Sequence, residues 1–377
     1  MKTLAAPRDS SPATPGADPL GVHARRRRAA LWTLGLTVGL VATLVVAVGA
    51  GAVAISPATV AGVIGDHLAA LVDRVLGTHL AGSGEIAATD DAIIWDVRLP
   101  RALLAALIGA GLSVCGVALQ AMVRNMLADP YLLGINSGAS SGAAAAILFG
   151  LGSGFGAYAL PASAFIGALA ASALVFVLAR SGGRVTSLRL LLSGVAVGYL
   201  LYALTSFLIF ASGSAEGARS VMFWLLGSLG LAAWDGLLGL TAAVVVATIA
   251  LLTLWGRSLD ALTVGDETAH TLGIAPDRFR IVLLVVVSLC VGVLVSAAGS
   301  IGFIGLVVPH LARRLVGAAH AAVVPVAALL GAILLVWADV VARVLLQPQE
   351  IPIGIITALL GAPFLLSLIR RFHAREV

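Results

Sequence analysis

The stretch RLPRALLAALIGAGLSVCGVALQ, residues 98–120, decides the fold class. Beyond Arg101 the chain continues to Val123 without a charged residue, which is long enough for a helix to cross about 30 Å of hydrocarbon. Comparable apolar runs recur along the 377-residue chain, which is 60% hydrophobic and 11% charged, against about 25% charged residues in soluble domains. The runs lack the alternation of membrane β-strands. The sequence therefore predicts an all-α, polytopic helical membrane protein.

The apolar runs predict ten transmembrane helices within one domain, residues 29–372. Residues 1–28, rich in Pro, Ser and Ala and ending in four arginines, are expected to form a disordered cytoplasmic leader, and residues 373–377 a cytoplasmic tail. The segment 220–230 is too short to span and is interpreted as an interfacial helix. The predicted spans are about 30–55, 101–123, 137–153, 157–180, 188–211, 234–256, 280–298, 303–316, 321–342 and 353–371.

The basic residues predict which side of the membrane each end occupies. An even number of spans places both termini on one side, and that side then holds 18 of the 23 basic residues. Because cytoplasmic loops carry an excess of Lys and Arg, this side is predicted to be the cytoplasm. The five basic residues that remain outside are Arg74, Arg98, Arg101, Arg219 and Arg343.

Three of these outer arginines, Arg98, Arg101 and Arg343, lie next to the ends of predicted spans. One interpretation is local: long side chains reach the lipid headgroups, or Arg343 pairs with Asp339 one helical turn earlier. The other is a docking surface for an acidic partner outside the cell. The residue types alone leave both interpretations open.

Several chemistries are disfavoured by what the chain lacks. The only lysine is Lys2, so the chain has no phosphate-binding Walker loop, and no motif for a catalytic nucleophile or a metal ion is present. The span interiors carry almost no ionisable groups, which argues against an ion-coupled transporter, although unwound backbone can bind sodium without a carboxylate. No basic face for nucleic acid is evident. We therefore expect a transport subunit that is not an enzyme, has no cofactor, and takes its energy from a partner chain.

The longest inner loop, residues 258–280, is a candidate contact for that partner. Asp266 and Glu267 open a short predicted helix, Ala269 and Leu272 are expected to share a face, and Gly273 followed by a proline is a usual helix stop. A short helix with one apolar face suits a groove in a soluble protein. An ordinary interfacial loop helix is the alternative.

The motifs resemble the FecCD-type permease subunits of bacterial ABC importers over residues 30–372. The matching pieces depart from the family pattern at Met126, which replaces a proline, and in AAHAAVVP at 318–325, which keeps only His320 of an Asp-His-Arg cluster. In order along the chain they are RLPRALLAALIGAGLSVCGVALQ, RNMLADPYLLGINSGAS, FWLLGSLG, TVGDETAHTLGIAPDR, AAGSIGFIGLVVPHLARRLVG, ADVVAR and IPIGIITALLGAPFLLSLIRR.

The resemblance implies a type II ABC importer permease in the bacterial inner membrane. The permease would pair with a second copy or a paralogue, and ATP-binding cassette ATPase subunits would bind the loop through Gly265, Asp266, Glu267, Leu272 and Gly273. An extracytoplasmic substrate-binding protein would place acidic residues on Arg98, Arg101 and Arg343. Ferric siderophore is the expected substrate. Cobalamin and haem are the alternatives within the family, and an ion-coupled secondary transporter is the alternative outside it.

Overall fold

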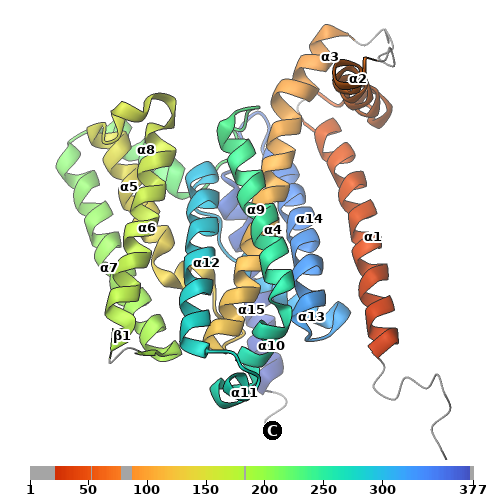
Figure 1. Ribbon diagram of the computed structural model, residues 1–377. Coiled ribbons are helices and arrows are strands. Elements are labelled where there is room, and N and C mark those ends of the chain that lie inside the picture. Colours follow the sequence, from red (N-terminus) through yellow and green to blue (C-terminus); the bar gives the residue numbers. More distant parts are fainter. Residues whose placement is uncertain (1–21, 52, 78–86, 182–183, 374–377) are drawn as a thin grey trace, which may run out of the picture.

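The structure is a computed structural model that describes residues 22–373 except 52, 78–86 and 182–183. Its long helices stand side by side in one bundle (Figure 1). Ten of them coincide with the predicted spans, which confirms the all-α, polytopic class. They are α1 (Val22–Gly49), α4 (Leu99–Val123), α5 (Ile135–Phe149), α6 (Ala159–Ala179), α7 (Ser187–Ser212), α9 (Gly236–Leu254), α12 (Pro276–Ala298), α13 (Ile304–Val316), α14 (His320–Val344) and α15 (Ile353–His373).

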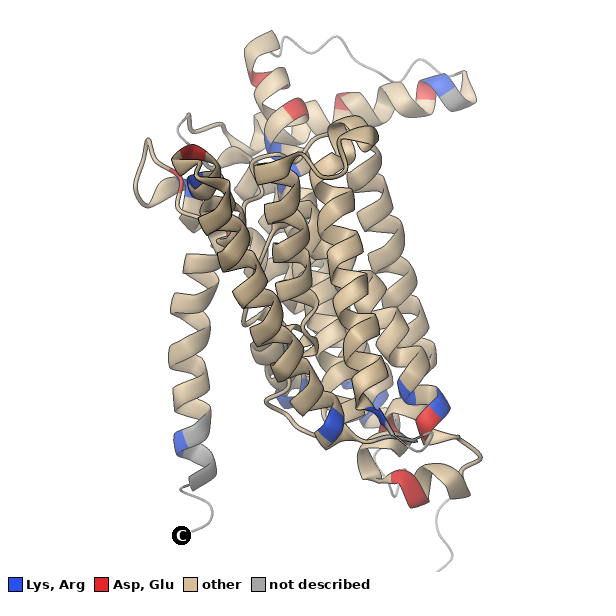
Figure 2. Cartoon of the chain, turned by 90° about the vertical axis from the view of Figure 1, so that its left-hand side faces the viewer, with Lys and Arg blue, Asp and Glu red and all other residues tan. Residues whose placement is uncertain are grey.

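Not every helix that coincides with a predicted span is long enough to cross a membrane. Within the described residues, seven helices are long and apolar enough to cross a membrane. The helices α5, α13 and α15 coincide with predicted spans but do not reach that length as apolar segments. The count of ten spans therefore stays a prediction. Lys, Arg, Asp and Glu gather at the two ends of the bundle and leave its middle apolar, as a bilayer requires (Figure 2).

Helix α4 forms the centre of the bundle. Nearly all of its residues are buried, and α9, α12, α13 and α14 pack around it. Glycines allow this packing: a side chain at Gly109 would collide with the backbone of Gly331 on α14, and one at Gly116 with Gly305 on α13. Small residues that let backbones approach closely are the usual packing device of membrane helices. The exposed helix α1 lies at the edge of this arrangement (Figure 1).

Shorter elements connect the long helices. At one end of the bundle, which the sequence predicts to face outside and which we call the outer end, lie α2 (Pro57–Leu76), α3 (Ala88–Ala92), the π-helical η1 (Ile93–Arg98) and α8 (Ala215–Leu225). The short helix predicted at 220–230 is confirmed, although it begins and ends five residues earlier. At the inner end lie α10 (Gly256–Val264) and α11 (Asp266–Thr271). The remaining elements are the 3-10 turns η2 (Pro130–Leu133) and η3 (Ser153–Tyr158) and the strand pair β1 (Arg180–Ser181) and β2 (Arg184–Val185).

One boundary differs from the sequence prediction, and one helix was not predicted. Helix α1 begins at Val22, so the four arginines up to Arg28 are helical and continuous with the first predicted span. Residues 1–21 and 374–377, which hold the rest of the predicted leader and nearly all of the tail, lie outside the described residues. Helix α2 was not predicted. Its start is marked by Ser56, whose side chain accepts a hydrogen bond from Thr59 N, and its end by Gly77 in the left-handed conformation.

Candidate functional site

The outer arginines meet at the end of α1. Arg98, at the last position of η1, donates hydrogen bonds from its guanidinium to the carbonyl oxygens of Val48, Gly49 and Val53, at 3.0, 3.2 and 2.7 Å. The last turn of a helix leaves its carbonyls without partners and carries a partial negative charge. Arg98 is only 9% exposed, so its charge sits within the protein against this helix end.

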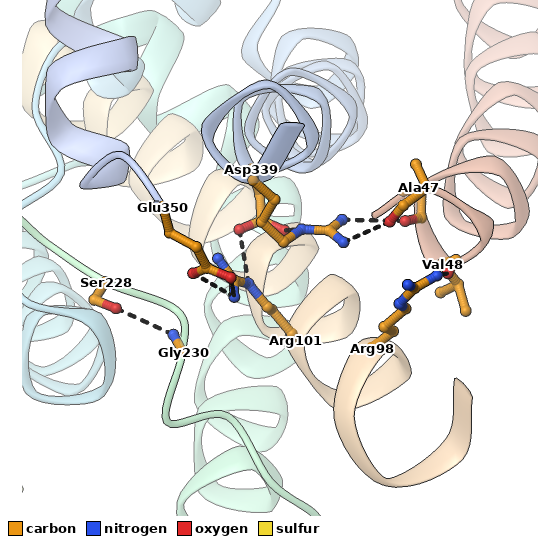
Figure 3. Close-up of polar contacts among 10 residues, drawn as sticks. Ala47, Val48, Arg98, Arg101, Ser228, Gly230, Asp339 and Glu350 are labelled. Carbon is orange, nitrogen blue, oxygen red and sulfur yellow. Dashed lines mark hydrogen bonds and ion pairs between the residues drawn. The ribbon is translucent and has the colours of Figure 1, made fainter. Parts of the chain in front are cut away.

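Arg343 reaches the same helix end from α14. Its guanidinium donates to the carbonyl oxygens of Ala50 and Ala47 at 2.7 and 3.1 Å, and its Nε donates to Oδ2 of Asp339 at 2.9 Å. The local pair of Arg343 with Asp339, one of the two interpretations open from sequence, is therefore confirmed. Two guanidinium groups from η1 and α14 thus cap one helix terminus (Figure 3).

Arg101 joins α4 to α14 and to the loop before α15. Its Nε donates to Oδ1 of Asp339 at 2.9 Å, and its Nη1 donates to both carboxylate oxygens of Glu350 at 2.9 and 3.0 Å. The side chain of Asp339 is 2% exposed, whereas that of Glu350 is 52% exposed. Figure 3 shows Arg101 between these two acidic residues. We call Arg98, Arg101, Arg343, Asp339 and Glu350 the outer cluster.

The outer cluster carries three positive and two negative charges, so it keeps one net positive charge on the outer face. Glu350 is its least buried carboxylate and was not singled out from sequence, because nothing in the pattern marks a loop carboxylate 249 residues from its partner. A cavity of about 460 Å³ lies beside the cluster and is lined by Arg101 and Glu350 together with Trp224, Ser228 and Leu231.

At the inner end, the predicted partner loop folds as α10, α11 and the start of α12. Asp266 accepts hydrogen bonds from the guanidinium of Arg280 on α12 at 2.6 and 3.1 Å, and Arg124 lies 3.4 Å away. The hydrogen bond from Arg280 holds the pKa of Asp266 below its usual value. Asp266 therefore ties α11 to the bundle, while Glu267 beside it is exposed.

The two glycines of this loop form bends at the two ends of α11. The apolar face predicted for Ala269 and Leu272, however, does not form. Gly265 and Gly273 both have positive φ, at 149° and 77°, and they bracket α11. Ala269 is buried and Leu272 is 64% exposed, so the expectation that they share an apolar face is wrong. The reason is that α11 ends at Thr271, which leaves Leu272 beyond the helix and turned outward. Leu272 and Val264 are two exposed apolar side chains of this loop.

A further inner contact joins α10 to the start of α14. The carboxylate of Asp260 accepts a hydrogen bond from the backbone N of His320 at 2.9 Å, and its Oδ1 lies 2.6 Å from Nδ1 of the same histidine. His320 is the residue retained in the segment 318–325 that departs from the family pattern. Met126, the other departure, is 48% exposed at the same end. The sequence pattern alone assigns no partner to His320.

The described residues contain no group of three His, Cys, Asp or Glu side chains that could hold a metal ion. Cys115 and Cys290 are both free and buried inside the bundle. The charged groups of the outer cluster, and Asp260, Asp266 and Arg280 at the inner end, pair with one another, with His320 or with backbone carbonyls. These contacts join helices at both ends of the bundle.

Comparison with known proteins identifies the family. The family model of the FecCD transport family matches residues 39–371. The cobalamin import system permease protein of Halobacterium salinarum is 44% identical over 289 residues, 77% of this chain and 76% of that protein. The hemin transport system permease protein of Yersinia pestis is 43% identical over 75% of this chain and 85% of that protein. The Fe(3+)-citrate import system permease protein of Bacillus subtilis is 40% identical over 74% and 81%.

A solved structure agrees with the sequence relatives. A chain described as an inward-facing conformation of a metal-chelate type ABC transporter superposes with a TM-score of 0.76 and 33% identity, and it covers 90% of this chain and 98% of its own length. The family model and the structural match extend over nearly all of the described residues. The chain therefore belongs to the FecCD transport family and is a multi-pass membrane permease of the ABC importer type.

Proposed function

We propose that this permease imports a metal chelate, with ferric siderophore as the cargo, using ATP hydrolysed by separate ATPase subunits. The relatives named above are described as permeases for cobalamin, hemin and ferric citrate, and another from Bacillus subtilis, 38% identical, as one for iron(3+)-hydroxamate. Two of these four relatives are thus named for iron(3+) complexes, which favours a ferric complex as the cargo. Cobalamin and haem are the alternative cargoes.

One observation carries the mechanism: rigid helices connect a charged cluster at each end of the bundle. Helix α14 begins at His320, bonded to Asp260 beside the inner loop, and near its other end it carries Asp339 and Arg343. In the described part of the chain the Lys, Arg, Asp and Glu residues gather at the two ends of the bundle, and in this proposal the helices between them are the moving parts. A partner that displaces one end of α14 shifts the packing at the other, and both partners can thereby bias two arrangements of the bundle.

ATPase subunits bind the inner loop in this proposal. The exposed Glu267 and Leu272 contact the ATPase, Gly265 and Gly273 set the bends that present α11, and Asp266 holds α11 against α12. A short exposed helix that enters a groove of its partner is a common recognition mode. Movement of the ATPase would pass through Asp266 to Arg280 and through Asp260 to α14.

The outer cluster receives the extracytoplasmic substrate-binding protein. Arg101 is the arginine that an incoming acidic residue reaches first, because its partner Glu350 is half-exposed and lies in a loop. Arg98 and Arg343 are held against the end of α1, so they contribute positive potential. Asp339, which accepts from both Arg343 and Arg101, holds Arg101 in position. Complementary charge of this kind mainly sets the orientation and the rate of association.

The proposed assembly contains a second permease copy or a paralogue in the bacterial inner membrane, with both termini in the cytoplasm. Helix α7 supports the second copy, since it exposes Tyr199, Tyr202, Phe207 and Phe210 along one helix at 62–86%. A contiguous exposed aromatic face of this size marks a membrane or protein contact. The 18-to-5 distribution of basic residues supports the orientation.

Uptake in cells tests the cargo. Iron-starved source cells with this gene deleted, and then restored, are supplied in parallel with radiolabelled ferric siderophore, cobalamin and haem. The proposal expects deletion to abolish ferric siderophore uptake, restoration to recover it, and the other two cargoes to be unaffected. Loss of cobalamin or haem uptake alone would show that this compound, and not ferric siderophore, is the cargo. The proposed importer mechanism would be unaffected by that result.

A further inference from the structure

A basic pocket lies at the inner end of α1, opposite the outer cluster and next to the Asp260–His320 contact. Its volume is about 640 Å³. One wall is the start of α1, which contributes Arg25, Arg26 and Arg28, and the other is the connection between α13 and α14, residues 316–325. Figure 1 shows the lower end of α1 on the side of the bundle where α13 and α14 lie. The pocket thus lies between α1 and α14, both long and apolar enough to cross a membrane, beside the end of α13.

The positive charge of this pocket is not neutralised within the described part of the chain. None of the ion pairs found there involves Arg25, Arg26 or Arg28. Three acidic residues at this end are already engaged, because Asp260 pairs with His320 and both Asp266 and Asp277 pair with Arg280. Three guanidinium groups beside one cavity therefore favour an anionic ligand.

The rest of the pocket is apolar and borders lipid. Ala29 and Ala30 on α1 face Val316, Ala322 and Pro325 across it. Helix α1 lies at the edge of the bundle and exposes Leu31, Leu34 and Val38 at 60–64% just above the arginines, so the pocket is reached from the bilayer. A free phosphate ion would contact only the arginines of the pocket. A phospholipid would contact the arginines with its phosphate and the apolar wall with its glycerol and acyl carbons.

We propose that this pocket binds the headgroup of an anionic phospholipid such as phosphatidylglycerol. The lipid phosphate lies among Arg25, Arg26 and Arg28, and the glycerol and first acyl carbons lie against the alanine- and proline-lined wall. Basic pockets between membrane helices are a recognised setting for anionic headgroups. The bound lipid fastens α1, a largely exposed span, to the α13–α14 connection. This site does not depend on the cargo or on the ATPase.

Native mass spectrometry of the purified, delipidated full-length chain tests the proposal. The chain is titrated with phosphatidylglycerol and with phosphatidylcholine. We expect one tightly held phosphatidylglycerol per chain, and we expect the double variant R25Q/R28Q to weaken it roughly 25-fold, since each arginine near an anionic lipid contributes about a fivefold effect. The matched control is R27Q/R189Q, which removes the same charge from the same end but from two arginines that do not line the pocket.

A second variant keeps the test valid if R25Q/R28Q does not fold. Ala318→Phe fills the pocket from the opposite wall without changing any charge, and it is expected to exclude the lipid as well. Equal affinity for the two lipids, or equal loss in R25Q/R28Q and the control, would overturn the proposal. Displacement of the lipid by millimolar inorganic phosphate would assign the site to a free anion and would also overturn it.

Discussion

Arg101 on α4 and Asp339 on α14 form a buried ion pair, with Nε and Oδ1 2.9 Å apart across 238 residues of sequence. The other oxygen of the same carboxylate accepts a hydrogen bond from Arg343, also at 2.9 Å. One carboxylate therefore holds two guanidinium groups, and it stands at the point where three of the long helices, α1, α4 and α14, come together at the outer end. The stability and the docking behaviour of this end follow from that arrangement.

Asp339→Asn is expected to destabilise the permease strongly. Without the carboxylate, Arg101 and Arg343 are left as buried cations, and breaking a buried pair by removing one partner costs about 3–5 kcal/mol. Glu350→Gln is the matched control, because its pair with Arg101 is half-exposed and such pairs contribute about 0–1 kcal/mol. Thermal unfolding in detergent measures both variants. Similar midpoints for the two would show that Asp339 does not organise the cluster.

Glu350→Gln is also expected to speed the association of the substrate-binding protein. The variant removes the carboxylate that occupies Nη1 of Arg101, while Nε stays on Asp339. An acidic residue of the partner then meets an unoccupied Nη1 and an outer cluster with one more positive charge. The association rate measured by surface plasmon resonance at low salt should rise several-fold, and the gain should shrink as salt increases.

Arg74→Gln controls for general charge, because Arg74 lies on α2, away from the outer cluster. An unchanged or slower association rate for Glu350→Gln would contradict the role given to Arg101. Assembly with the ATPase should be the same for both variants, since neither residue lies at the inner end.

Asp266→Asn is expected to loosen α11 at neutral pH. The pKa of Asp266 is lowered by its hydrogen bond with Arg280, so the ionised form stabilises the folded loop at every pH above the ordinary aspartate value of about 4, and that contribution is lost as the pH falls below it. Amide hydrogen exchange of residues 266–273 should therefore be slow and, once corrected for intrinsic rates, nearly constant from about pH 5 to 8 in the natural chain. It should be faster throughout in the variant.

Glu267→Gln tests contact with the ATPase separately from the stability of α11. Glu267 is exposed and takes part in none of the ion pairs in the described residues, so this variant should keep the slow exchange of α11 while weakening the association with the ATPase. If Asp266→Asn and Glu267→Gln behaved alike in both measurements, the division of roles between them would be wrong.

Asp260→Ala is expected to weaken the coupling between binding-protein docking at the outer end and ATP hydrolysis at the inner end. The variant removes the acceptor for the backbone N and Nδ1 of His320, which joins α10 to the start of α14. In the reconstituted complex, stimulation of ATP hydrolysis by the loaded binding protein should fall, while basal hydrolysis should stay near its normal rate. Asp260→Asn keeps an acceptor for the backbone N and should retain more of the stimulation. Full stimulation in Asp260→Ala would remove α14 from the coupling path.

The positions of the long helices could be predicted from sequence because a bilayer imposes one requirement on every span. A run such as Ala102–Val123 has to be apolar and helical whatever surrounds it. The pair of Asp339 with Arg343 was also accessible, since residues four apart on a helix are neighbours. Gly273 could be identified as a helix stop for a similarly local reason.

Contacts between distant segments could not be predicted in this way. That Arg98 caps α1 depends on where the chain returns after about 45–50 residues, and that Glu350 meets Arg101 depends on 249 residues of intervening fold. Helix α2 escaped prediction because it lies outside the apolar runs that identify spans. The wrong face assigned to Leu272 arose because α11 ends one residue before it, and the ends of helices are the least certain feature of a sequence pattern.

Transport in proteoliposomes tests the central claim most directly. The permease is reconstituted with its ATPase subunits, with ATP sealed inside and binding protein loaded with radiolabelled ferric siderophore outside. The account predicts accumulation of label that requires internal ATP and the binding protein, and that persists when ionophores collapse the ion gradients. Accumulation driven by an ion gradient without ATP would contradict it and would identify an ion-coupled transporter.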